Sequence, residues 1–141
     1  MKRYAFSLAQ VLRVRRIEED RAAANLAAAR AAALAAEEHV ARRRAALAGM
    51  APPAERGPAG GFLAWYEIVG RAGDALTAAG VDRDAATAEM DARRGEWSAA
   101  AMRVSALERL DERRREAHVT EARRDEAARV DDLVAGLRRR R

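Results

Sequence analysis

The side chains best suited to chemistry in this sequence are two histidines and a few carboxylates near the C-terminus. His39 and His118 have no companion at the spacing that metal ligands need. Asp125, Asp131 and Asp132 approach a cluster, but neighbouring residues of a helix point to different faces, and the surrounding arginines would neutralise them. The sequence has no cysteine and no Gly-rich loop followed by Lys-Ser/Thr. We therefore expect no catalytic, cofactor or metal site, and no enzyme.

Three arginine runs offer a different kind of chemistry, at residues 42–44, 113–115 and 138–141. The chain carries 27 basic and 22 acidic residues, a net charge of +5. Such runs serve as solvated helix faces, as docking charges for an acidic protein groove, or as contacts to nucleic-acid phosphates. Acidic residues flank the first two runs, which argues against a dedicated nucleic-acid stripe.

The helices that must position these residues are separated by one helix-breaking segment. Residues 49–61, with the sequence GMAPPAERGPAGG, hold all three prolines and four of the nine glycines. Long runs rich in Ala, Leu, Arg and Glu lie on both sides, a composition typical of long helices or coiled coils. The sequence therefore predicts two helices, at about 5–48 and 62–138, joined by a bend at 49–61.

Both predicted helices carry an apolar stripe at heptad spacing. In the first helix, the two series of positions are Leu12, Glu19, Leu26, Ala33, Val40 and Leu47, and Arg15, Ala22, Ala29, Ala36 and Arg43. In the second helix, they are Phe62, Val69, Leu76, Arg83, Met90, Trp97 and Val104, and Trp65, Ala72, Ala79, Ala86, Arg93, Ala100 and Leu107. We expect Ser7 to cap the first helix and Gly49 to end it. Gly80, with Asp82 as a cap, is where a kink or restart of the second helix would fall.

These stripes predict the fold class: an all-α, long antiparallel two-helix coiled-coil hairpin, with the second helix longer than the first. Neither helix can bury its stripe alone, so we expect residues 1–141 to form a single domain. With the bend centred near residue 55, residue i should face residue 110 minus i. Leu12 would then lie near Trp97, and Leu26 near Asp84.

Three of the six aromatic residues follow the bend directly. Phe62, Trp65 and Val69 share one helix face, so Tyr66 and Ile68 must point partly elsewhere. The group is either a cap over the loop or an exposed patch that binds another protein.

Two segments resemble the flagellar type III export protein family FliJ. Residues 3–19, RYAFSLAQVLRVRRIEE, resemble that family's N-terminal pattern of an aromatic, a Leu, a Val-Leu element and then acidic residues. Residues 107–116 and 121–133, LERLDERRRE and EARRDEAARVDDL, resemble its closing stretch. Chain length and the positions of the bend and the aromatic group also agree.

The resemblance implies a non-enzymatic stalk and chaperone component of flagellar export, needed for motility, similar to the two-helix stalk of a rotary ATPase γ subunit. Such a stalk inserts into the hexameric export ATPase FliI, contacts the cytoplasmic part of the export gate protein FlhA, and handles export chaperones. On this basis we expect the ATPase to meet Arg13, Arg16, Arg109, Arg113 and Arg124. We expect the gate to meet Phe62, Tyr66 and Val69.

No apolar run approaches the ~20 residues that span a membrane, and we recognise no signal peptide. We therefore expect a cytoplasmic protein, monomeric in isolation and peripheral at the inner membrane of the flagellar base. The alternatives are a generic cytoplasmic coiled-coil adaptor, dimeric through its second helix, and a basic coiled coil associated with nucleic acid. A membrane-surface helix is disfavoured by the narrow, alanine-rich apolar faces.

Overall fold

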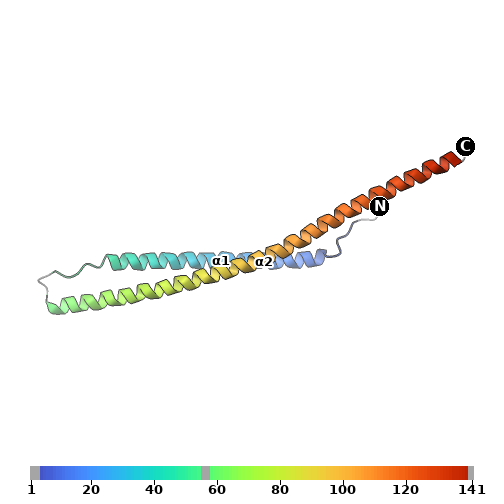
Figure 1. Cartoon of the computed structure of the whole chain (residues 1–141). Coiled ribbons are helices and arrows are strands. Elements are labelled where there is room, and N and C mark those ends of the chain that lie inside the picture. The colour runs from blue at the N-terminus through green and yellow to red at the C-terminus, as the bar shows by residue number, and fades with distance from the viewer. Residues whose placement is uncertain (1–3, 55–57, 140–141) are drawn as a thin grey trace. The chain divides into compact units, whose positions relative to one another are not determined.

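The computed structural model describes residues 4–54 and 58–139, and within these ranges all regular structure is α-helical. Two helices follow one another, α1 at Ala9–Ala48 and α2 at Ala59–Arg139 (Figure 1). They pack against each other as a hairpin. The predicted fold class is confirmed, including the greater length of the second helix.

The chain divides into two compact units, and both helices contribute to each. We call residues 20–98 the bend unit, and residues 1–19 with 99–141 the terminal unit. The division does not test the expectation of a single domain, which stays a prediction.

In the bend unit, the two helices run side by side in opposite directions (Figure 1). Leu26, Ala29 and Val40 from α1 are buried, as is Ala79 from α2. All four were predicted seam positions. Because Ala29 and Ala79 each bury little area, the unit depends on a few larger side chains.

Charged residues at predicted seam positions of α2 are neutralised by their neighbours. Arg83 is half-buried and lies 2.7 Å from Asp84 Oδ1 and 3.8 Å from Glu37 Oε2 of α1. Arg93 pairs with Glu89 at 2.8 Å and with Glu96 at 2.9 Å. Long arginine stems lie along apolar surface while their charged ends reach carboxylates, so the stripe tolerates these interruptions.

In the terminal unit, the seam is formed by Leu12 from α1 and by Ala100 and Val104 from α2, all buried. Arg16 Nη2 lies 2.7 Å from Glu108 Oε1, which ties the two helices together beside the seam. The seam thus continues through the residues that its heptad spacing predicted.

The pairing register differs from the expectation. The pair Arg83–Glu37 sums to 120 and the pair Arg16–Glu108 sums to 124, against the predicted 110. The expected neighbours of Leu12 and Leu26 are therefore wrong. The physical reason lies in the connection, because α2 starts beyond the end of α1 (Figure 1) and its first turns have no α1 residue opposite them.

Helix boundaries follow local chemistry with small changes. Ser7 lies before Ala9, but its hydroxyl accepts a hydrogen bond from Arg114 Nη1 at 2.8 Å. Gly49 follows the last residue of α1, and its N–H donates to the Ala45 carbonyl oxygen at 3.0 Å. The α2 backbone is helical throughout Gly80, so no restart needs Asp82 as a cap.

We expect Leu26→Ala to lower the free energy of unfolding by about 2 kcal/mol, because it empties a buried position of a thin seam. Leu26 is 4% exposed. The measurement is urea unfolding followed by circular dichroism.

Leu34→Ala is the matched control, since it makes the same change on the same helix and unit at a side chain 63% exposed. It should change stability by less than ~0.5 kcal/mol. Equal effects of the two substitutions would contradict the assigned seam.

Candidate partner-binding surfaces

Exposed surfaces of the described residues are candidates for binding a partner. Within residues 4–54 and 58–139, no three His, Cys, Asp or Glu side chains are grouped to hold a metal ion. In the same ranges, no helix is long and apolar enough to cross a membrane. His39 and His118 are both half-buried.

Charge is divided unevenly between the two units. In the sequence, the terminal unit carries 17 basic and 11 acidic residues, whereas the bend unit carries 10 and 11. The whole excess of positive charge therefore belongs to the terminal unit. A field of one sign raises the encounter rate with an acidic partner, and salt weakens it.

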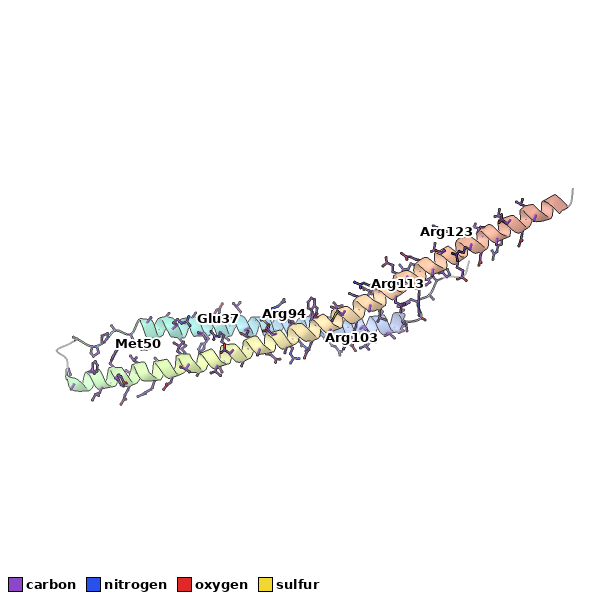
Figure 2. The ribbon with its side chains drawn as sticks, viewed as in Figure 1. Glu37, Met50, Arg94, Arg103, Arg113 and Arg123 are labelled. Atoms are coloured by element: carbon purple, nitrogen blue, oxygen red, sulfur yellow. The ribbon has the colours of Figure 1, made fainter. Side chains whose placement is uncertain are left out.

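Four of the five predicted docking arginines are exposed and form no ion pair within the described residues: Arg13, Arg109, Arg113 and Arg124. The fifth, Arg16, is also exposed but forms an ion pair with Glu108 at 2.7 Å. At 100° per residue, the three arginines of α2 share a face opposite the buried Val104. Figure 2 labels Arg113 on this helix. The structure thus brings Arg109, Arg113 and Arg124 onto one stripe.

A feature that the sequence did not indicate is a short segment packed on α2. Residues 4–8 precede α1, and we call them the N-terminal strap. The Tyr4 hydroxyl donates to Asp111 Oδ1 at 2.7 Å and lies 3.2 Å from the Asp111 carbonyl oxygen. The Tyr4 ring meets the His118 ring edge-on, with centroids 5.6 Å apart. The Tyr4–Asp111 contact joins residues 107 positions apart in the chain, and together with the His118 contact it anchors the strap.

The strap also engages two members of the arginine run 113–115. The Arg114 guanidinium lies 5.8 Å from the Phe6 ring centroid and donates to Ser7 Oγ at 2.8 Å. The Arg115 guanidinium lies 5.8 Å from the Tyr4 ring centroid and pairs with Asp111 at 3.0 Å. The only sequence signal for this arrangement is a Tyr-x-Phe element just before the first helix. That element does not indicate which residues of α2 the strap contacts.

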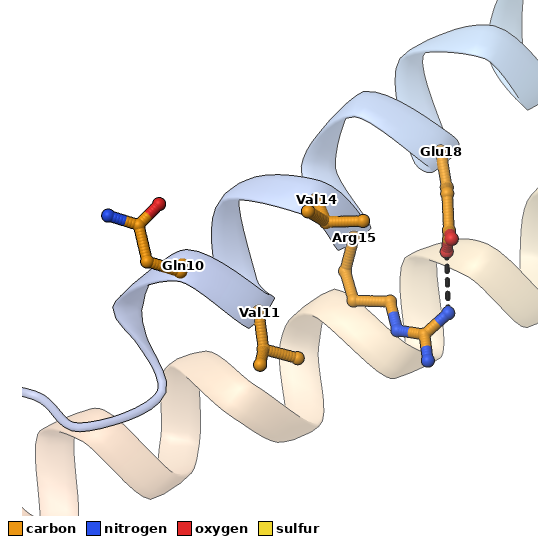
Figure 3. Close-up of a pocket in the computed structure, with 5 residues that line it drawn as sticks. All are labelled: Gln10, Val11, Val14, Arg15 and Glu18. Atoms are coloured by element: carbon orange, nitrogen blue, oxygen red, sulfur yellow. Dashed lines mark hydrogen bonds and ion pairs between the residues drawn. The ribbon is translucent and has the colours of Figure 1, made fainter.

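Large apolar side chains lie exposed on the first turns of α1. Val11 and Val14, with Gln10, Arg15 and Glu18, line a shallow hollow of about 290 Å³ (Figure 3). An ion pair of 2.7 Å between Arg15 and Glu18 closes one side of it. All five residues come from one helix, so the hollow is a groove between side chains. The heptad repeat does not predict this hollow.

The aromatic group after the bend is largely on the surface. Phe62 is 53% exposed and Tyr66 is 67% exposed, whereas Val69 is half-buried. The Phe62 ring lies 5.6 Å from the ring of Trp65, which is half-buried. Leu63 is also exposed and was not among the predicted contacts. These residues form an exposed apolar patch, which is the second candidate surface.

Burial and the bond to Asp111 raise the pKa of Tyr4 above its ordinary value of 10.0, against the opposing charges of Arg115 and Arg114. A raised pKa means that the folded chain holds the phenolic proton more tightly. The strap contact is therefore complete below pH 10 and is lost as pH rises through the higher folded pKa.

In a Tyr66→Phe chain, Tyr4 is the one tyrosine left, so absorbance at 295 nm reports its ionisation alone. We expect a midpoint above pH 10, and a lower midpoint when Asp111→Asn is added. An unchanged midpoint in the second variant would show that Asp111 does not hold the phenol.

The comparisons with known proteins agree with the geometry. No curated protein and no solved structure matches the chain. The family model described as "Flagellar FliJ protein" matches residues 4–141, which is nearly the whole chain. The chain therefore belongs to the flagellar FliJ protein family, whose members are non-enzymatic components of the flagellar export apparatus.

Proposed function

We propose that this chain is the stalk of the flagellar export apparatus, entering the export ATPase hexamer with its terminal unit and meeting the export gate with its bend unit. The observation that carries the proposal is the family match over residues 4–141, together with the hairpin of two long helices. Export chaperones are further partners in this proposal, which places the chain at the cytoplasmic face of the flagellar base.

The terminal unit supports ATPase docking through its charge. Its positive excess and the outward stripe of Arg109, Arg113 and Arg124 suit a ring lined by acidic side chains. Charges at the rim of an interface mostly set the encounter rate and orientation. Arg16 has a smaller part in this proposal, because a partner would have to replace its 2.7 Å contact with Glu108.

The bend unit supports gate binding through apolar contact. Phe62 and Tyr66 present aromatic rings to solvent, and Val69 lies below them on the same side of α2. Aromatic side chains on an exposed helix face are frequent anchors of protein interfaces. The half-buried Trp65, stacked beside Phe62, would hold this face in shape.

The first test concerns the arginines. A variant with Gln at Arg13, Arg109, Arg113 and Arg124 should bind the purified export ATPase at least about tenfold more weakly at low salt, mainly through slower association. Surface plasmon resonance at several salt concentrations measures this, and the difference should shrink as salt increases.

The matched control for this test places Gln at four exposed arginines of the bend unit, namely Arg21, Arg30, Arg43 and Arg44. It removes the same charge and should leave association with the ATPase close to that of the unmodified chain. Equal weakening by both variants would show that only net charge matters and would remove the assigned docking stripe.

The second test concerns the gate. Tyr66→Ala with Val69→Ala should weaken binding to the cytoplasmic domain of the gate protein by about tenfold, as loss of interface anchors does. Val81→Ala is the control, because Val81 is 63% exposed on the same helix and outside the patch. Gate binding that is unchanged in a pull-down of the double variant would make the gate assignment wrong.

A further inference from the structure

The three arginines of the run 113–115 have different surroundings. Arg113 belongs to the outward stripe of α2. Arg114 is held by Phe6 and Ser7, and Arg115 by Tyr4 and Asp111. All three arginines are exposed, but the N-terminal strap contacts Arg114 and Arg115 and leaves Arg113 without an internal partner among the described residues.

A carboxylate of a partner would bind Arg114 more strongly than Phe6 and Ser7 do. A cation over an aromatic ring and a bond to a neutral hydroxyl are both weaker than a charge-assisted pair with Asp or Glu. Tyr4, Ala5 and Phe6 have no regular secondary structure. Besides side-chain contacts, two backbone hydrogen bonds join the strap to the start of α1, from Ala9 N–H to the Phe6 carbonyl oxygen at 3.1 Å and from Leu12 N–H to the Leu8 carbonyl oxygen at 2.9 Å. Lifting the strap therefore costs side-chain contacts and at most the first turn of α1.

Arg115 differs, because Asp111 lies one turn before it on the same helix, at 3.0 Å. That ion pair survives when the strap leaves. The charge that the strap controls is therefore Arg114, while Tyr4 serves as the anchor through Asp111 and His118.

We propose that the N-terminal strap is a displaceable mask on Arg114: it holds the exposed guanidinium in contacts with Phe6 and Ser7, and an acidic protein segment lifts it when that segment docks on the terminal unit. In the masked form, Arg113 is the docking charge of the run; in the lifted form, Arg114 joins it. The identity of the acidic partner as the export ATPase rests on the proposed function, whereas the mask itself requires only a partner rich in carboxylates.

The binding test is a double-mutant cycle with a poly-L-glutamate peptide and, separately, with the export ATPase as probes. The strap is released by Tyr4→Ala with Phe6→Ala, and the masked charge is removed by Arg114→Gln. Release of the strap should tighten binding roughly three- to tenfold. Adding Arg114→Gln to the released strap should cancel that gain. Arg114→Gln alone, with the strap intact, should change binding by less than about twofold.

A matched control removes two exposed apolar side chains elsewhere. Leu34→Ala with Val81→Ala changes the bend unit, where each side chain is 63% exposed and no strap contact is made. Its affinity for poly-L-glutamate should equal that of the unmodified chain. A gain of the same size in this control would overturn the mask, because it would trace to lost apolar side chains in general.

Displacement is read directly by nuclear magnetic resonance on the Tyr66→Phe chain with ring-labelled tyrosine. The unmodified strap should show magnetisation transfer between the Tyr4 and His118 rings, and saturating poly-L-glutamate should abolish it. Persistence of that contact in the peptide-bound chain, or a strap variant that binds no more tightly, would overturn the proposal.

The two proposals fail in different ways. If the ATPase does not bind the chain while poly-L-glutamate lifts the strap, the proposed ATPase docking is wrong and the mask stands. If the ATPase binds and the strap variant gains nothing with either probe, the mask is wrong and the docking function stands. If neither probe binds, both are overturned.

Discussion

The structure depends on the narrow apolar seam between α1 and α2. Each helix carries a stripe of small and aliphatic residues that water would otherwise cover, and only the other helix can bury it. Leu12, Leu26 and Val40 are the larger α1 residues in this seam, and alanines fill most of the space between them. Removing these stripes would leave two solvated helices with no reason to fold back.

The narrow seam specifies the alignment of α1 with α2 only weakly. Alanine is nearly the same size wherever it is placed, so alanine pairs distinguish poorly between one alignment of the helices and another. Contacts between unlike side chains define the alignment here, namely Arg16 with Glu108, Arg83 with Glu37, and Tyr4 with Asp111. The two ion pairs are worth little because their side chains are partly exposed, but each of the three contacts can be made in one register only.

Because the seam buries few side chains, most of the chain's surface is free for partners. The positive excess lies in the terminal unit and the aromatic patch lies in the bend unit. The two candidate surfaces would therefore bind partners through different interactions. Long-range charge attraction guides encounter, and apolar burial gives affinity after contact. Such separation suits a family that serves in a multi-protein export apparatus.

The sequence by itself determined the two helices, their order and most of their buried faces, because heptad spacing and the Pro/Gly segment act locally. The predicted seam positions Phe62 and Trp97 are exceptions, since their side chains are exposed. Even the charged seam residues Arg83 and Arg93 stand where the repeat put them, half-buried beside carboxylates one or a few residues away. Tertiary structure alone decided the register and the strap. Both depend on contacts between residues far apart in sequence, such as Tyr4 with His118, and no local pattern in an alanine-rich chain specifies those distances.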